Sequence, residues 1–125
     1  MKLSSLQAML SGTLSPDAFV SEISAEISTY QSSLGKVGGV VPIRVTEDQD
    51  VTVTRSDIKA LCNLFAVGKI SPLELAYVAD GIQLAERVEF VDSWVADSVA
   101  EFTDPEINGP FTRARAIEIV NESGA

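Results

Sequence analysis

Histidine is absent from this 125-residue sequence, and Cys62 is its single cysteine. Without histidine there is no side chain that titrates near neutral pH in its ordinary state, and Ser-His-Asp and Cys-His catalytic arrangements are excluded. A single cysteine excludes an intramolecular disulfide, and ordinary zinc and iron sites need more histidine or cysteine ligands. Cys62 lies between Leu61 and Phe65 on an apolar helix face, so it is predicted to be a small buried residue. We therefore expect no enzyme and no cofactor.

Long apolar runs and clusters of positive charge are also missing. No stretch approaches the ~20 apolar residues that span a bilayer, and the polar start from Met1 to Gln7 does not fit a secretory signal. Nine Lys and Arg stand against eighteen Asp and Glu, a formal net charge of −9. Nucleic acids and anionic membranes bind clustered positive charge. The sequence therefore predicts a cytoplasmic protein with neither a nucleic-acid nor a membrane partner, and it is compatible with a basic protein partner.

The composition, 46% hydrophobic and 22% charged, is that of one globular domain covering residues 1–125. Apolar residues recur at intervals of three and four and predict helices. The predicted helices are residues 3–10, 16–34, a third that is capped by Ser56 or Thr54 and ends before Gly68, a fourth from 72, a fifth ending before Asp104-Pro105, and a last one after Thr112. The fourth helix ends either at Asp80-Gly81 or near Arg87.

A different periodicity marks residues 41–54. Val41, Ile43 and Val45 alternate with polar or proline positions, and Val51 and Val53 alternate with threonines. A period of two with β-branched residues predicts strands, here joined by the polar turn 47–50 as a β-hairpin. The predicted fold class is therefore mainly α (α+β): a bundle of about five or six helices with one β-hairpin inserted near residues 40–54.

Two segments of the sequence echo each other. Gly12-Thr13-Leu14-Ser15-Pro16 is followed by Phe19, and Gly68-Lys69-Ile70-Ser71-Pro72 is followed by Leu75. Ser-Pro at this position is typical of a helix start, with serine as the cap and proline as the first helical residue. The echo indicates two helix–turn–helix pairs packed together, although independent use of Ser-Pro at helix starts explains it equally well.

The stretch from Val88 to Glu106 contains six acids and no Lys or Arg. If the stretch is one continuous helix, one face carries Val88, Val91, Val95, Val99 and Phe102. Another face carries Phe90, Trp94, Asp97 and Glu101. In the alternative, 88–91 is a strand, Asp92 caps a helix from Ser93, and Phe90 leaves that second face. Exposed aromatics ringed by polar groups are typical of protein interfaces. The predicted partner-binding residues are Phe90, Trp94, Asp97 and Glu101, with Glu89 and Asp92 as rim charges; if the helix buries both faces, only the acids remain exposed.

Asp104, Glu106 and Asn108, followed by Gly109, occupy the first positions of a calcium-loop pattern. The position that requires a bidentate glutamate is Arg115, whose charge repels a cation. We therefore interpret Asp104-Pro105 as a turn and predict no metal site.

The segment from Leu64 to Glu74 is similar in style to the helix–turn–helix starts of bacterial toxin-immunity proteins, and the whole chain resembles them in size, acidity and helical layout. The resemblance implies inhibition of a basic toxin through an acidic surface. The predicted function is a non-catalytic acidic protein-binding module, with toxin immunity as its most concrete version. The alternatives are a structural homodimer joined through the hairpin edge and a chaperone for a secreted protein.

Overall fold

The computed structural model describes residues 1–34, 43–103 and 111–123. It is mainly helical, with a small two-stranded sheet, which confirms the predicted class. The helices are α1 (Leu3–Ser11), α2 (Pro16–Leu34), α3 (Arg55–Ala66), α4 (Pro72–Leu84), α5 (Ser93–Phe102) and α7 (Arg113–Ser123), and the strands are β1 (Val51–Val53) and β2 (Val88–Phe90).

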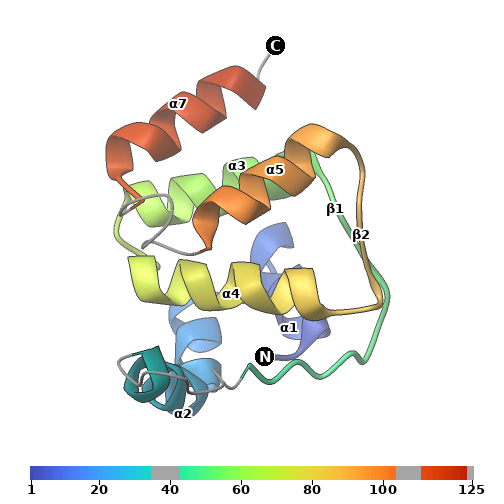
Figure 1. Ribbon diagram of the computed structural model, residues 1–125, viewed down its shortest axis with the longest axis vertical. Coiled ribbons are helices and arrows are strands. Elements are labelled where there is room, and N and C mark those ends of the chain that lie inside the picture. The colour runs from blue at the N-terminus through green and yellow to red at the C-terminus, as the bar shows by residue number, and fades with distance from the viewer. Residues whose placement is uncertain (35–42, 104–110, 124–125) are drawn as a thin grey trace.

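The helices pack around one continuous cluster of buried side chains to which all of them contribute. α7 lies across α3, α5 lies against α4 and α3, and α2 supports α4 from the other end of the molecule (Figure 1). Tyr77, Phe19 and Ile82 are among the largest fully buried side chains. Within the described ranges, none of the helices has the length and apolar character needed to cross a membrane.

The small sheet is parallel, so the predicted hairpin is wrong. β1 pairs with β2 in the register Val51 to Val88 and Val53 to Phe90, and Thr46 instead forms an isolated parallel bridge with Lys2. Residues 41–42 lie outside the described ranges. Alternation of apolar and polar residues reports that one side of an extended chain is buried, as Ile43 and Val45 partly are, but it does not identify the hydrogen-bonding partner. The alternative prediction of a strand at Val88 is confirmed.

The two echoing segments form the same turn. Gly12 and Gly68 have φ angles of 87° and 80°, the two positive φ values among the described residues. Thr13 N–H donates to Ala8 O at 2.9 Å, and Lys69 N–H donates to Leu64 O at 2.8 Å. This is the Schellman closure, in which a glycine in the left-handed region ends a helix.

The helices that follow these turns also start alike. Ser15 Oγ accepts a hydrogen bond from Ala18 N–H, and Ser71 Oγ accepts one from Glu74 N–H, both at 3.1 Å. The predicted pair of helix–turn–helix units is therefore present as α1–α2 and α3–α4, and α1 contacts α3 while α2 contacts α4.

We expect Gly12→Ala and Gly68→Ala each to lower the free energy of unfolding by about 1–2 kcal/mol, because an L side chain is strained at positive φ. A Cβ at either position meets nothing within 4 Å, so strain is the only penalty. Urea unfolding measures the loss. Gly→Asn at the same positions is the matched control and restores most of the stability, because asparagine tolerates this conformation. Equal losses for alanine and asparagine would contradict the assignment to backbone strain.

Candidate protein-binding site

The six predicted contact residues fall on β2, on α5 and on the junction between them, a region called here the β2–α5 segment (residues 88–102). Glu89 and Asp97 are exposed, whereas Phe90, Asp92, Trp94 and Glu101 are partly buried. Phe90 and Trp94 pack against the core cluster. The segment is a strand followed by a helix, so Phe90 does not share a helix face with Trp94.

Asp92 works inside the fold as a helix cap. Its Oδ1 accepts a hydrogen bond from Val95 N–H at 2.9 Å, and its Oδ2 accepts one from Arg55 Nε at 2.8 Å. The Arg55 guanidinium and then the Val95 amide hold the pKa of Asp92 below its ordinary value. Asp92 therefore links the start of α5 to the start of α3.

Arg55 also lies over the single tryptophan. Its Cζ is 5.1 Å from the centre of the Trp94 ring, a cation–π contact worth about 0.5–1 kcal/mol at exposed sites. Since Trp94 packs against the core cluster and Arg55 lies over its ring, only part of its surface can face solvent. The anchor predicted from the sequence is thus a Trp94–Arg55 pair rather than a bare aromatic ring.

Glu101 joins α5 to α7. Its two carboxylate oxygens accept hydrogen bonds from Arg115 Nε at 2.6 Å and Nη2 at 2.9 Å. Arg115 Nη1 reaches Glu118 and Glu122, each at 3.1 Å. The carboxylate of Glu101 raises the pKa of Arg115 further above its ordinary value. Glu101 is on the predicted side of α5, but its charge is neutralised within the chain.

The acids that stay free are Glu89 and Asp97, together with Glu86, which sequence reasoning missed. None of the three forms an ion pair within the described ranges, and all three are exposed. Val91, which is 54% exposed, lies between Glu89 and Asp97 in the chain. This part of the chain therefore exposes negative charge and one large apolar side chain, Val91.

A polar hollow of about 260 Å³ borders this surface beside the two strands. Its lining comprises Asp50, Val51, Thr52, Glu86, Arg87 and Glu89. Arg87 is already bound: its Nε donates to Asp50 at 2.8 Å and its Nη1 to the carbonyl oxygen of Glu47 at 2.9 Å. The hollow therefore presents two free carboxylates beside one neutralised arginine, which favours a cationic group as occupant.

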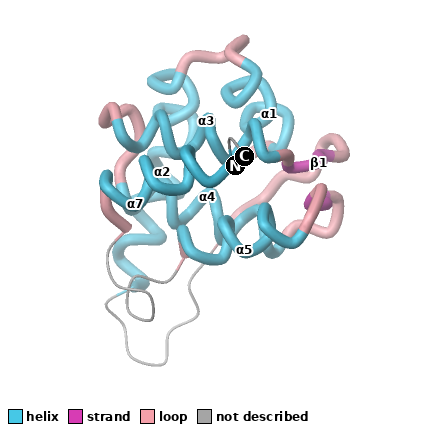
Figure 2. Tube along the Cα trace, turned by 90° about the horizontal axis from the view of Figure 1, so that it is seen from above, coloured by secondary structure: helices cyan, strands magenta, loops and turns pink. Residues whose placement is uncertain are grey.

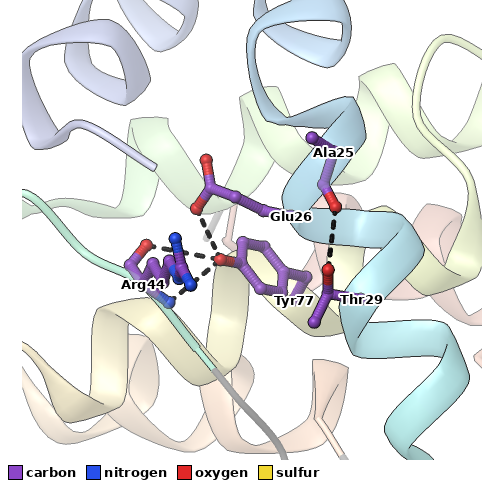
Figure 3. Close-up of a pocket in the computed structure, with 5 residues that line it drawn as sticks. All are labelled: Ala25, Glu26, Thr29, Arg44 and Tyr77. Atoms are coloured by element: carbon purple, nitrogen blue, oxygen red, sulfur yellow. Dashed lines mark hydrogen bonds between the residues drawn. The ribbon is translucent and has the colours of Figure 1, made fainter.

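A second polar cluster lies between α2, α4 and the segment that contains Arg44 (Figure 3). The Tyr77 hydroxyl donates to Glu26 Oε1 at 2.6 Å and accepts from Arg44 N–H at 3.0 Å. The α-amino group of Met1 also donates to Glu26. The adjoining pocket has a volume of only about 130 Å³. We therefore interpret the cluster as structural and call it the Tyr77 latch, because its hydrogen bonds join α2, α4, the segment around Arg44 and the N-terminus.

Cys62 and the calcium-loop pattern are the remaining reactive and metal-binding candidates of the sequence. Burial raises the pKa of Cys62 to about 12, so its thiol is protonated at neutral pH. No cluster of three or more His, Cys, Asp and Glu side chains with metal-site geometry occurs among the residues described. Of the calcium-loop pattern, Asp104, Glu106, Asn108 and Gly109 lie outside those ranges, and Arg115 is bound by three carboxylates.

Replacing Arg55 tests whether it covers Trp94. We expect Arg55→Gln to shift the Trp94 emission to longer wavelength and to increase quenching by acrylamide, because the ring loses its cover. Lys59→Gln, which removes one positive charge from the same helix, is the control and leaves both readouts unchanged. Unchanged emission in Arg55→Gln would show that the core, not Arg55, shields the ring.

Tyr77 gives the latch a pH dependence. Burial and the hydrogen bond to Glu26 raise the pKa of Tyr77 to about 12, above the unfolded value of about 10. The folded state therefore favours the neutral phenol, and this stabilisation is complete below pH about 10 and lost as the pH rises to about 12. We expect Tyr77→Phe to cost about 1–3 kcal/mol at neutral pH and to flatten the alkaline loss of stability in urea unfolding. Tyr30→Phe is the control and keeps that alkaline loss.

Comparison with known proteins identifies no relative. No family model, no curated protein and no solved structure matches the chain. What the chain does must therefore be inferred from the contacts described above.

Proposed function

We propose that this protein is a non-catalytic module that binds a protein partner with a basic surface, and that the exposed part of the β2–α5 segment makes the contact. The observation that carries the proposal is that residues 86–97 hold three exposed acids without an ion pair in the described ranges, Glu86, Glu89 and Asp97, together with exposed Val91 and partly buried Trp94. Neutralisation of a basic toxin is the most concrete version, as the resemblance to immunity proteins implies.

Electrostatics supports a basic partner. The arginines nearest this surface, Arg55 and Arg87, are each neutralised by an aspartate, so the net charge that a partner meets there is negative. Complementary charge raises the rate of association and disfavours partners of like charge. An acidic surface therefore selects a basic partner before any close contact forms.

The rigidity of the segment supports a preformed interface. Its strand is held by β1, its helix is capped by Asp92, and its far end is tied to α7 through Glu101. A surface fixed before binding loses little conformational entropy in the complex. Val91 and the exposed part of Trp94 supply the apolar contact area that charges alone do not provide.

The alternative of a homodimer joined through the hairpin edge has no support among the described residues, because residues 43–53 do not form the predicted hairpin. That edge required a ladder between residues 41–45 and 51–54, but Val51–Val53 is paired with Val88–Phe90. The chaperone alternative gains no observation of its own among the residues described.

Charge reversal at the free acids tests the proposal. The full chain is immobilised and exposed to a lysate of the cells that produce it, and recovered proteins are quantified by mass spectrometry. We expect the amount of basic protein recovered by Glu89→Lys/Asp97→Lys to be at least about tenfold lower than the amount recovered by the wild type. The control Asp17→Lys/Glu22→Lys makes the same change of charge on α2 and retains them. Equal recovery by both variants would overturn the assignment of this surface.

A further inference from the structure

An apolar groove lies on another face of the molecule, between the C-terminal parts of α1 and α3. It encloses about 370 Å³, and its lining comprises Met9, Leu10, Ser11, Gly12, Ala60, Asn63, Leu64 and Val67. Val67 is 67% exposed, the highest value among the exposed large hydrophobic residues of the described ranges. The residues contributed by α3 recur at intervals of three and four, so they form one continuous stripe along the helix.

The charge around this groove differs from that of the rest of the chain. Helix α1 carries no charged residue, and from Ile58 to Leu73 the only charges are those of Lys59 and Lys69. None of the residues that line the groove is charged, so in a chain with a net charge of −9 a second acidic molecule meets little repulsion there. Neither lysine forms an ion pair within the described ranges.

We propose that a second copy of this chain covers the groove in a two-fold symmetric dimer, with α3 of one copy antiparallel to α3 of the other. An isologous interface requires a patch that is complementary to itself. With the axis passing near Asn63 and Leu64, residues at equal distances on either side of it face each other. Val67 of each copy then comes opposite Ala60 of the other, and the small alanine leaves room for the exposed valine.

The same register places charges in complementary positions. Lys69, beyond the C-terminal end of α3, comes close to Asp57, near the N-terminal end of α3 in the other copy. Asp57 Oδ2 is held in place by Thr54 N–H at 2.9 Å within a capping box, so the carboxylate is fixed before the copies meet. Two such pairs form in one dimer, because the axis repeats each contact.

The proposed dimer leaves the β2–α5 segment free. Viewed from above, α1 lies on the opposite side of the molecule from α5 (Figure 2), and α3 contacts both helices. The groove is lined by Ala60 and later residues of α3, whereas Arg55, which lies over Trp94, is the first residue of that helix. Self-association through the groove and binding of a basic partner through the acidic surface therefore use different residues, so substitutions in one set test that proposal separately from the other.

Sedimentation equilibrium from micromolar to millimolar concentration tests the dimer. We expect a concentration-dependent mass for the wild type, and a dissociation constant raised roughly tenfold or more by Val67→Glu, because a carboxylate replaces a contact residue in the centre of the interface. Leu84→Glu is the matched control: Leu84 is 64% exposed and lies outside the groove, so self-association is unchanged. A wild type that is monomeric throughout, or a dimer equally sensitive to both variants, overturns the proposal.

A cysteine placed near the axis tests the register. We expect Asn63→Cys to form a disulfide-linked dimer under mild oxidation, since the two copies of this residue face each other, whereas exposed Gln83→Cys, away from the groove, does not. The wild type is the second control, because its Cys62 is buried. Equal cross-linking by both variants would show random collision rather than the proposed interface.

Discussion

The junction between the two strands and the helices that follow them depends on the hydrogen bonds that the Asp92 carboxylate accepts from Val95 and Arg55. β1 leads directly into α3 and β2 leads into α5, and in a parallel pair both strands deliver the chain to the same end of the sheet. Arg55 and Asp92 therefore meet although 37 positions separate them. One side chain caps α5, fixes Arg55 and thereby places Arg55 over Trp94. The shape of the acidic surface follows from this single junction.

Four of the eighteen acids of the chain stabilise helix starts. Asp57 and Glu74 complete capping boxes, Asp92 caps α5, and Asp48 accepts the Ser4 N–H in the first turn of α1. Carboxylates are favourable there because the first amides of a helix lack partners and the helix dipole is positive at that end. Net charge is therefore a poor guide to a binding surface: the informative acids are those without a structural task.

Patterns within short stretches of the sequence predicted most of the fold. The glycines at positive φ, the Ser-Pro caps and the helical stripes depend on neighbours in the chain, so the sequence reveals them. The parallel partner of β1, the cover over Trp94 and the bond between Glu101 and Arg115 depend on residues brought together from a distance. The alternation at 43–53 showed which side chains turn inward but not which strand lies alongside, and so suggested a hairpin. Asp97 was predicted from its helical spacing to Trp94 and Glu89 as a rim charge beside it; Glu86 was missed because it precedes the apolar stripe.

The acidic surface and the acid-free groove have one physical origin. A chain of net charge −9 is repelled least by its own copy where few acids lie, and the uncharged α1 and the second half of α3 provide such an area. The one acid in the proposed contact, Asp57, faces Lys69 of the other copy. Other acids cap helices or pair with arginines, and Glu86, Glu89 and Asp97, near β2 and on α5, form no ion pair among the described residues. In the proposed dimer two acidic surfaces point away from the axis. A partner with repeated basic sites would then gain avidity from contacts that are individually modest.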